Sequence, residues 1–84
     1  MKFCMITFRS VTPAQRGEGL LRRARLDCSI QRTPRWMEEQ GCGYSLRVKC
    51  EDVMGALELL RAHDVPFRKV YLRRENGKVE ELAL

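Results

Sequence analysis

A cysteine flanked by two glycines stands in the middle of this 84-residue sequence, in the stretch TPRWMEEQGCG at 33–43. Because glycine adds no side chain beside Cys42 and frees the backbone, the thiol can face solvent. Consecutive backbone N–H groups in such a turn can converge on an anion. Positive charge and N–H donors favour the thiolate, which is the form that attacks. The pattern therefore indicates either a nucleophilic loop cysteine or a tight turn in which cysteine replaces serine.

Arginine residues lie close to this cysteine in the sequence. Arg35 belongs to the same segment, and Arg32 and Arg47 flank it on the two strands that we expect it to connect. A guanidinium group binds anions through several N–H donors at once. We therefore expect this positive charge to lower the pKa of the Cys42 thiol.

The segment between these strands also carries turn signals and one aromatic residue. Thr33 can cap a short turn that has Pro34 at its first position, and Gly41 can end that turn in a left-handed conformation. Trp36 has two interpretations. It is either an anchor for a partner protein, since tryptophan and arginine are enriched at interface hot spots, or a lid over the apolar end of the sheet.

The other cysteines do not form a recognisable site with Cys42. Gaps of 24, 14 and 8 residues separate Cys4, Cys28, Cys42 and Cys50, whereas structural zinc ligands usually come in close pairs. The sequence starts directly with a strand pattern, without an export signal or a run that could span a bilayer. We expect reduced thiols, no metal, no cofactor, no membrane contact and a cytoplasmic location. Cys4, Cys50 and Cys28 are predicted to be structural.

Composition is that of one ordinary globular domain covering residues 1–84. Hydrophobic residues make up 44% of the chain and charged residues 32%. The net charge of +5 comes from 12 arginines and 4 lysines against 11 acidic residues. The arginines are dispersed along the chain, so no single basic stripe is predicted.

Five strands and two helices must position the cysteine. Alternating patterns predict strands at 2–9, 28–33, 44–49 and 67–74, and the Asn76-Gly77 pair predicts a hairpin that leads into a fifth, edge strand at 78–82. On the strand at 44–49, the expected inward residues are Tyr44, Leu46 and Val48, and the expected outward residues are Ser45, Arg47 and Lys49.

The helices are predicted between these strands. The first begins at Thr12 with capping-box spacing and Pro13 at its first helical position, and ends near Asp27. The second follows Glu51 and closes around His63-Asp64. Their predicted apolar stripes are Ala14, Gly17, Leu21 and Ala24 on the first helix and Val53, Ala56, Leu57 and Leu60 on the second. The resulting order is β-α-β-β-α-β with a C-terminal hairpin extension, an α+β sandwich of the ferredoxin-like class.

The order and spacing of several short motifs resemble the selenium/sulfur carrier protein-like family. These motifs are Ile6-Thr7-Phe8, Thr33-Pro34-Arg35, Cys42-Gly43 and the apolar strand Tyr44 to Val48. The resemblance covers roughly residues 2–72. It implies a carrier that accepts sulfur or selenium on Cys42 as a persulfide or selenosulfide and passes it to a partner enzyme, more a carrier than a complete enzyme.

The resemblance also implies roles for the neighbours of Cys42. Arg35 would stabilise the anionic terminal atom, and Gly41 and Gly43 would supply backbone freedom. Donor and acceptor proteins would be its partners. Two regions depart from the family pattern: the bulky, acidic stretch Trp36 to Gln40, and the tail Arg73 to Leu84, on which the resemblance is silent.

Two other functions are alternatives to the carrier. An RNA-recognition domain would place aromatic residues at outward positions of its third strand, where this chain has Ser45, Arg47 and Lys49, so we expect no nucleic acid. The stronger alternative is a regulatory or assembly domain that binds a small anion and forms a homodimer through its sheet, with Cys42 incidental.

Overall fold

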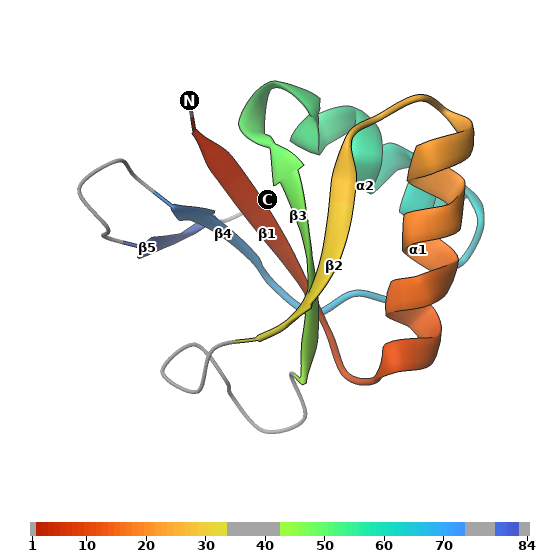
Figure 1. The fold of residues 1–84 in the computed structure, drawn as a ribbon, viewed down its shortest axis with the longest axis horizontal. Helices are drawn as coiled ribbons and strands as arrows, with labels where there is room; N and C mark the ends of the chain where they lie inside the picture. The colour runs from red at the N-terminus through yellow and green to blue at the C-terminus, as the bar shows by residue number, and fades with distance from the viewer. Residues whose placement is uncertain (1, 34–42, 74–78, 83–84) are drawn as a thin grey trace.

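A computed structural model of the chain describes residues 2–33, 43–73 and 79–82. Five strands form one antiparallel sheet in the order β2-β3-β1-β4-β5, and both helices lie on one face of it (Figure 1). The elements are β1 (Phe3–Phe8), α1 (Val11–Arg23), β2 (Cys28–Arg32), β3 (Tyr44–Lys49), the 3-10 turn η2 (Cys50–Asp52), α2 (Val53–Ala62), β4 (Val70–Arg73) and β5 (Val79–Leu82). The predicted α+β class is confirmed, and the arrangement is compatible with the predicted ferredoxin-like sandwich.

Helix α1 begins earlier than the sequence predicts. Its N-cap is Ser10 in an extended conformation, and no side chain caps the first turn. The predicted capping box at Thr12 is therefore wrong, because Thr12 already lies inside the helix. Pro13 is tolerated at the third helical position, since the N–H groups of the first turn have no partner within the helix.

The same helix also ends earlier than predicted. Arg25 adopts a left-handed backbone with φ of 62°, and the N–H of Leu26 donates to the carbonyl of Leu21 at 2.9 Å. This Schellman-type geometry stops the helix at Arg23. Ala24 is consequently exposed, where the sequence predicted it in the apolar stripe.

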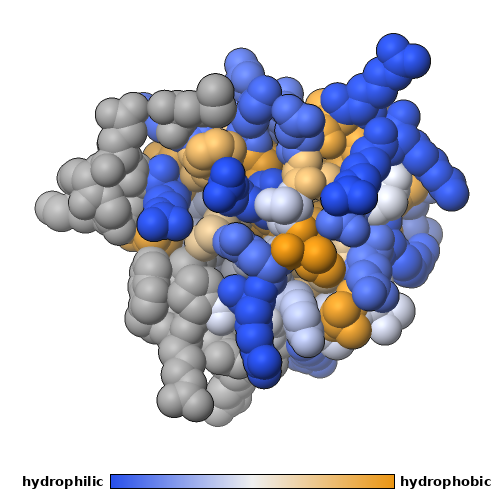
Figure 2. Space-filling model, viewed as in Figure 1, coloured by the Kyte–Doolittle hydropathy of each residue, from blue (hydrophilic) through white to orange (hydrophobic). Residues whose placement is uncertain are grey.

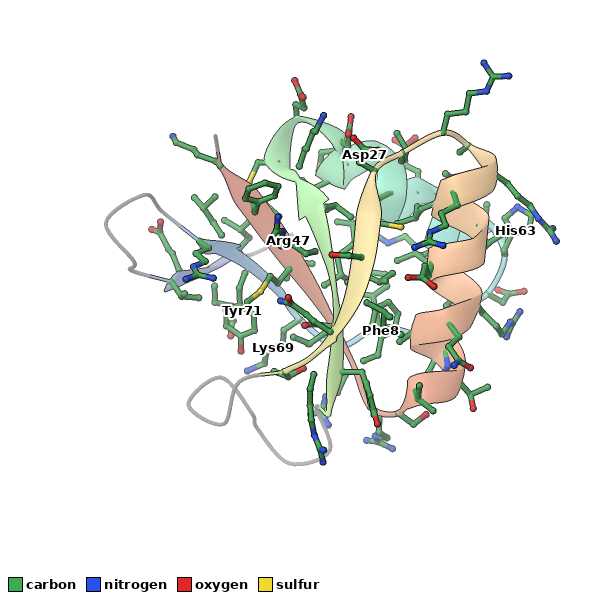
Figure 3. All side chains as sticks on the ribbon, in the orientation of Figure 1. Phe8, Asp27, Arg47, His63, Lys69 and Tyr71 are labelled. Carbon is green, nitrogen blue, oxygen red and sulfur yellow. The ribbon has the colours of Figure 1, made fainter. Side chains whose placement is uncertain are left out.

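The hydrophobic core lies between the helices and the sheet. Its fully buried members include Ile6, Phe8, Leu21, Leu46, Val48, Leu57 and Leu60. Figure 3 shows Phe8 between the sheet and α1. Gly17 lets the helices and sheet approach closely, because a Cβ at this position would lie 3.0 Å from Leu60 Cδ2 and 3.1 Å from Leu46 Cδ1.

The opposite face of the sheet, here called the helix-free face, is formed by the alternate residues of each strand. Arg47, Lys69 and Tyr71 lie on this side of the sheet, away from the helices (Figure 3). Its centre is buried all the same: Met5 is 2% exposed and Thr7 is fully buried. Both faces of β1 are therefore covered, as the sequence indicated.

The connection from α2 to β4 is fixed to the end of β1. The N–H of Thr7 donates to the carbonyl of Lys69, and the N–H of Arg68 donates to the carbonyl of Thr7, each at 2.8 Å. Regular strand geometry starts only at Val70, three residues later than predicted. Strand β5 pairs with β4 as expected, while the predicted Asn76-Gly77 turn lies outside the described residues. None of the helices in the described ranges is long and apolar enough to span a membrane.

Candidate functional site

The two ends of the segment that carries Cys42 meet at one end of the sheet. Arg32 pairs with Tyr44 in the β2–β3 ladder, and one step further the N–H of Thr33 donates to the carbonyl of Gly43 at 3.1 Å. Cys42 is bonded to Gly43, so its chain position is tied to this end of β3. The predicted site residues Arg35, Trp36, Gly41 and Cys42 themselves lie outside the described residues.

Two buried hydroxyl groups lie beside these ends. Thr33 is 4% exposed and Ser45 is fully buried, and neither side-chain oxygen has a hydrogen-bond partner within the described part of the chain. A buried hydroxyl without a partner costs about 1–3 kcal/mol, so native proteins rarely keep one without a use. Both residues belong to the helix-free face, because Thr33 follows Gln31 by two positions and Gln31 pairs with Ser45.

The burial of Ser45 overturns the prediction that it faces solvent. Gln31 and Thr7 are its direct neighbours on the two flanking strands. The Gln31 Nε2 atom lies 3.1 Å from the sulfur of Met5, a residue of β1. Because β3 runs between β2 and β1, this contact carries the Gln31 side chain across β3. A small serine beneath a long side chain is shielded from solvent.

The arginines predicted around Cys42 are separated by the structure. Arg32 is exposed at the end of β2, next to the ends of the segment. Arg47 is also exposed, but its guanidinium carbon lies 4.0 Å from the centre of the Phe3 ring, a cation–π contact. Phe3 pairs with Lys49 at the other end of β3 from Tyr44. The geometry thus brings Arg32, and not the guanidinium of Arg47, to the segment ends.

Gly43 is not required by backbone strain. A Cβ at this position would meet no atom within 4 Å, and its φ lies outside the left-handed range. The expectation that Gly43 is needed for its conformational freedom is therefore not supported by its backbone conformation. What Gly43 still provides is the lack of a side chain next to Cys42 in the sequence.

The three cysteines in the described part of the chain lie in or against the core, as predicted. Burial, a hydrogen bond to Cys50 and the charge of Cys50 raise the pKa of the buried Cys4 thiol to about 12. Burial, followed by the charge of Glu18, raises the pKa of Cys28, whose thiol lies 3.8 Å from the Glu18 carbonyl as a donor. Thiols with raised pKa values are poor nucleophiles at neutral pH.

Sequence reasoning missed the paired burial of Ser45 and Thr33. The alternation at 44–49 places Ser45 on the face opposite Leu46, but it cannot show that a side chain from another strand crosses over it. The only signal in the sequence was the pair itself, a short hydroxyl side chain on β3 opposite a long glutamine side chain on β2.

Comparison with known proteins gives the family. The chain matches the model of the family described as "Putative Se/S carrier protein-like" over residues 3–72, a range that includes Cys42 and both ends of its segment. The chain belongs to this family, and the resemblance inferred from the sequence is confirmed. No curated protein and no solved structure matches the chain in the corresponding searches.

Proposed function

We propose that this protein carries sulfur or selenium on Cys42, as a persulfide or selenosulfide, and delivers it to a partner enzyme. The observation that carries this proposal is the family match across residues 3–72, which includes the cysteine between two glycines. The antiparallel pairing of β2 with β3 supports the proposal, because it holds both ends of the cysteine segment together.

The chemistry requires only a thiolate and access to it. The Cys42 thiolate attacks the terminal sulfur of a donor persulfide, the sulfur–sulfur bond of the donor breaks, and the donor leaves as a thiolate while Cys42 keeps the sulfur and its proton. Delivery is the reverse step. An acceptor thiolate attacks the terminal sulfur on Cys42, and Cys42 leaves as a thiolate. With selenium as cargo, the bond that is broken and formed is sulfur–selenium.

The surroundings of the segment ends support this use. The hydroxyl of Thr33, which has no partner within the described part of the chain, is a candidate hydrogen-bond donor to an anionic sulfur or selenium atom, and Arg32 adds positive charge at the same end of the sheet. Arg35 is proposed to assist from within the segment. Thiols with raised pKa values elsewhere in the fold, such as Cys4 and Cys28, would leave cargo chemistry to Cys42.

Partner proteins would supply and receive the cargo. In the view of Figure 2, hydrophobic side chains reach the described surface only in small groups among hydrophilic ones. Contacts made by the face in this view would therefore be mainly polar and brief, as transfer requires. We propose Trp36 as the apolar anchor for such a partner, and the cytoplasm as the location. A homodimer of this protein would form through the helix-free face of the sheet.

Loading with a persulfide donor tests the proposal. Wild-type protein, Cys42→Ser and the matched control Cys28→Ser are incubated with a donor and analysed by intact-mass spectrometry under non-reducing conditions. Wild type and Cys28→Ser should each gain one sulfur atom, and reductant should remove it. Equal loading of Cys42→Ser would contradict the proposal, because the cargo would then be on another thiol.

A further inference from the structure

A pocket lined by arginine lies at the start of α1, on the helix side of the sheet. It has a volume of about 470 Å³, within the range of about 300–1,000 Å³ typical of small-molecule sites. Its walls come from the β1–α1 turn, the first turns of α1 and the connection from α2 to β4. The residues that matter for its chemistry are Arg9, Arg16, Arg68, Ser10 and Phe67.

The charge of this pocket is one-sided. Three of the residues that line it are arginines, and none of its described lining residues is an aspartate or glutamate. Guanidinium groups gathered around one concave volume raise the local concentration of anions and bind the oxygens of phosphate in pairs. The sequence does not predict this site, because Arg9, Arg16 and Arg68 are far apart in the chain and line one pocket only in the folded protein.

The arginines are mounted on a fixed frame. Arg68 lies in the connection from α2 to β4, and its backbone N–H donates to the carbonyl of Thr7 at 2.8 Å. Arg9 comes directly after the last residue of β1. The Nη2 of Arg16 donates to the carbonyl of His63 at 3.4 Å, which joins α1 to the end of α2. Three elements of the fold therefore set the backbone positions of these pocket-lining arginines, and the bond to His63 holds the Arg16 guanidinium near the end of α2.

The start of α1 reinforces the preference for an anion. Its N-cap side chain makes no capping bond, and its first turn has no acidic residue. The N–H groups at the start of a helix carry partial positive charge and point away from the helix body. Ser10, Thr12 and Pro13 at this helix start line the pocket, so the helix dipole adds to the positive field of the arginines.

One wall of the pocket is apolar. Pro13, Pro66 and Phe67 line it, and the Phe67 ring is half-buried. The Arg61 guanidinium carbon lies 5.6 Å from the centre of that ring and holds it from outside the pocket. A flat organic group can pack against this ring while an attached phosphate reaches the arginines.

We propose that this pocket binds a small phosphomonoester with a flat apolar body, separately from the cargo chemistry of Cys42. The pocket and the segment ends lie at the same end of the sheet, since Phe8 precedes Arg9 and pairs with Tyr44. The proposal is argued only from lining residues in the described ranges 2–33 and 43–73. It therefore invokes no role for Cys42, and its test is separate from that of the carrier function.

Titration with phenyl phosphate, followed by two-dimensional amide NMR, tests this inference. Wild type should show saturable shifts at the amides of Arg9, Ser10 and Phe67, and the affinity should fall as salt is raised. Arg9→Gln should weaken binding by about tenfold, the usual scale for loss of one charge-assisted contact. The control Arg23→Gln removes the same charge from an α1 residue outside this pocket and should change the affinity less than about twofold.

Other probes and variants separate this site from less specific binding. Cys42→Ser should bind phenyl phosphate as wild type does, and loss of binding in this variant would overturn the proposal. Equal affinity for inorganic phosphate would overturn the role of the Phe67 wall, and equal affinity for benzoate would overturn the phosphate class. Equal weakening by Arg9→Gln and Arg23→Gln would show that only overall charge attracts the anion.

Discussion

Thr7 and Ser45 lie directly opposite each other on β1 and β3, yet among the described residues only the hydroxyl of Thr7 has a hydrogen-bond partner. Thr7 Oγ1 accepts the N–H of Lys69 at 3.0 Å and donates to the Lys69 carbonyl at 3.1 Å. Both side chains are fully buried. A hydroxyl group thus holds Lys69, just before β4, to β1 at Thr7, whereas the hydroxyl of Ser45 on the next strand has no partner in the described part of the chain.

This difference predicts opposite effects of removing the two hydroxyls. Thr7→Val leaves the partly buried N–H of Lys69 without its Thr7 acceptor and should lower the free energy of unfolding by about 1–3 kcal/mol. Ser45→Ala breaks no hydrogen bond between described residues and should keep stability within about 0.5 kcal/mol or raise it. Urea unfolding measures both. Equal destabilisation by the two variants would contradict the assignment.

Gly43→Ala separates the needs of the fold from those of the site. Because a Cβ here meets no atom within 4 Å, the free energy of unfolding of the variant should lie within about 0.5 kcal/mol of the wild-type value. Thermal unfolding followed by circular dichroism provides the measurement. A loss of more than about 1 kcal/mol would mean that the backbone at this position needs glycine after all.

The two glycines of α1 provide a matched pair for testing the core. Gly19→Ala adds a methyl group in open space and should stabilise the helix by about 0.5–1 kcal/mol. Gly17→Ala places its Cβ 3.0 Å from Leu60 and 3.1 Å from Leu46, both fully buried, and overpacking should cost about 1–3 kcal/mol. Chemical denaturation compares the variants. A Gly17→Ala protein as stable as Gly19→Ala would show that α1 can move away from the sheet.

The thiol of Cys4 predicts a loss of stability in alkali. Its pKa rises from 9.0 to about 12 in the fold, mainly through burial. The Cys4 thiol therefore ionises in the unfolded chain at a lower pH than in the folded chain. Its contribution to the free energy of unfolding is complete below about pH 9 and is lost as pH rises from about 9 towards 12. Cys28, whose pKa is also raised, adds a loss of the same sign.

Urea unfolding in the presence of reductant, from about pH 7 to about pH 10.5, checks this dependence. Cys4→Ala should be less stable than wild type at neutral pH, because it leaves a small cavity, and should lose less stability above pH 9. Parallel curves for the two proteins would contradict the raised pKa of Cys4.

Much of the fold can be predicted from local patterns. The alternation at 44–49 gave the bounds of β3, and the stripe of Val53, Ala56, Leu57 and Leu60 gave the buried face of α2. Such patterns succeed because burial against one neighbouring layer imposes the period of the element itself. The prediction of where α1 ends failed because Arg25 adopts the left-handed conformation that stops the helix, although arginine lacks the conformational freedom of glycine.

The surroundings of the candidate site were less predictable, because they depend on contacts between distant segments. The cover over Ser45 comes from Gln31, and the cation–π contact that draws Arg47 away from the segment ends comes from Phe3. The arginine pocket joins residues from both ends of the chain. Sequence spacing identified Cys42 and its family, whereas only the folded chain shows which polar groups lack partners.

The reactivity of Cys42 is the most direct test of the central claim. Alkylation at a series of pH values from about 5 to 9, with each modified cysteine identified by mass spectrometry, gives the rate and apparent pKa of every thiol. The account predicts that Cys42 reacts first, with an apparent pKa well below the value of about 8.5 of a free thiol, and that Cys4 reacts last. A Cys42 that reacts no faster than Cys28, or no faster than in the unfolded chain, would contradict the account and leave the segment as a turn.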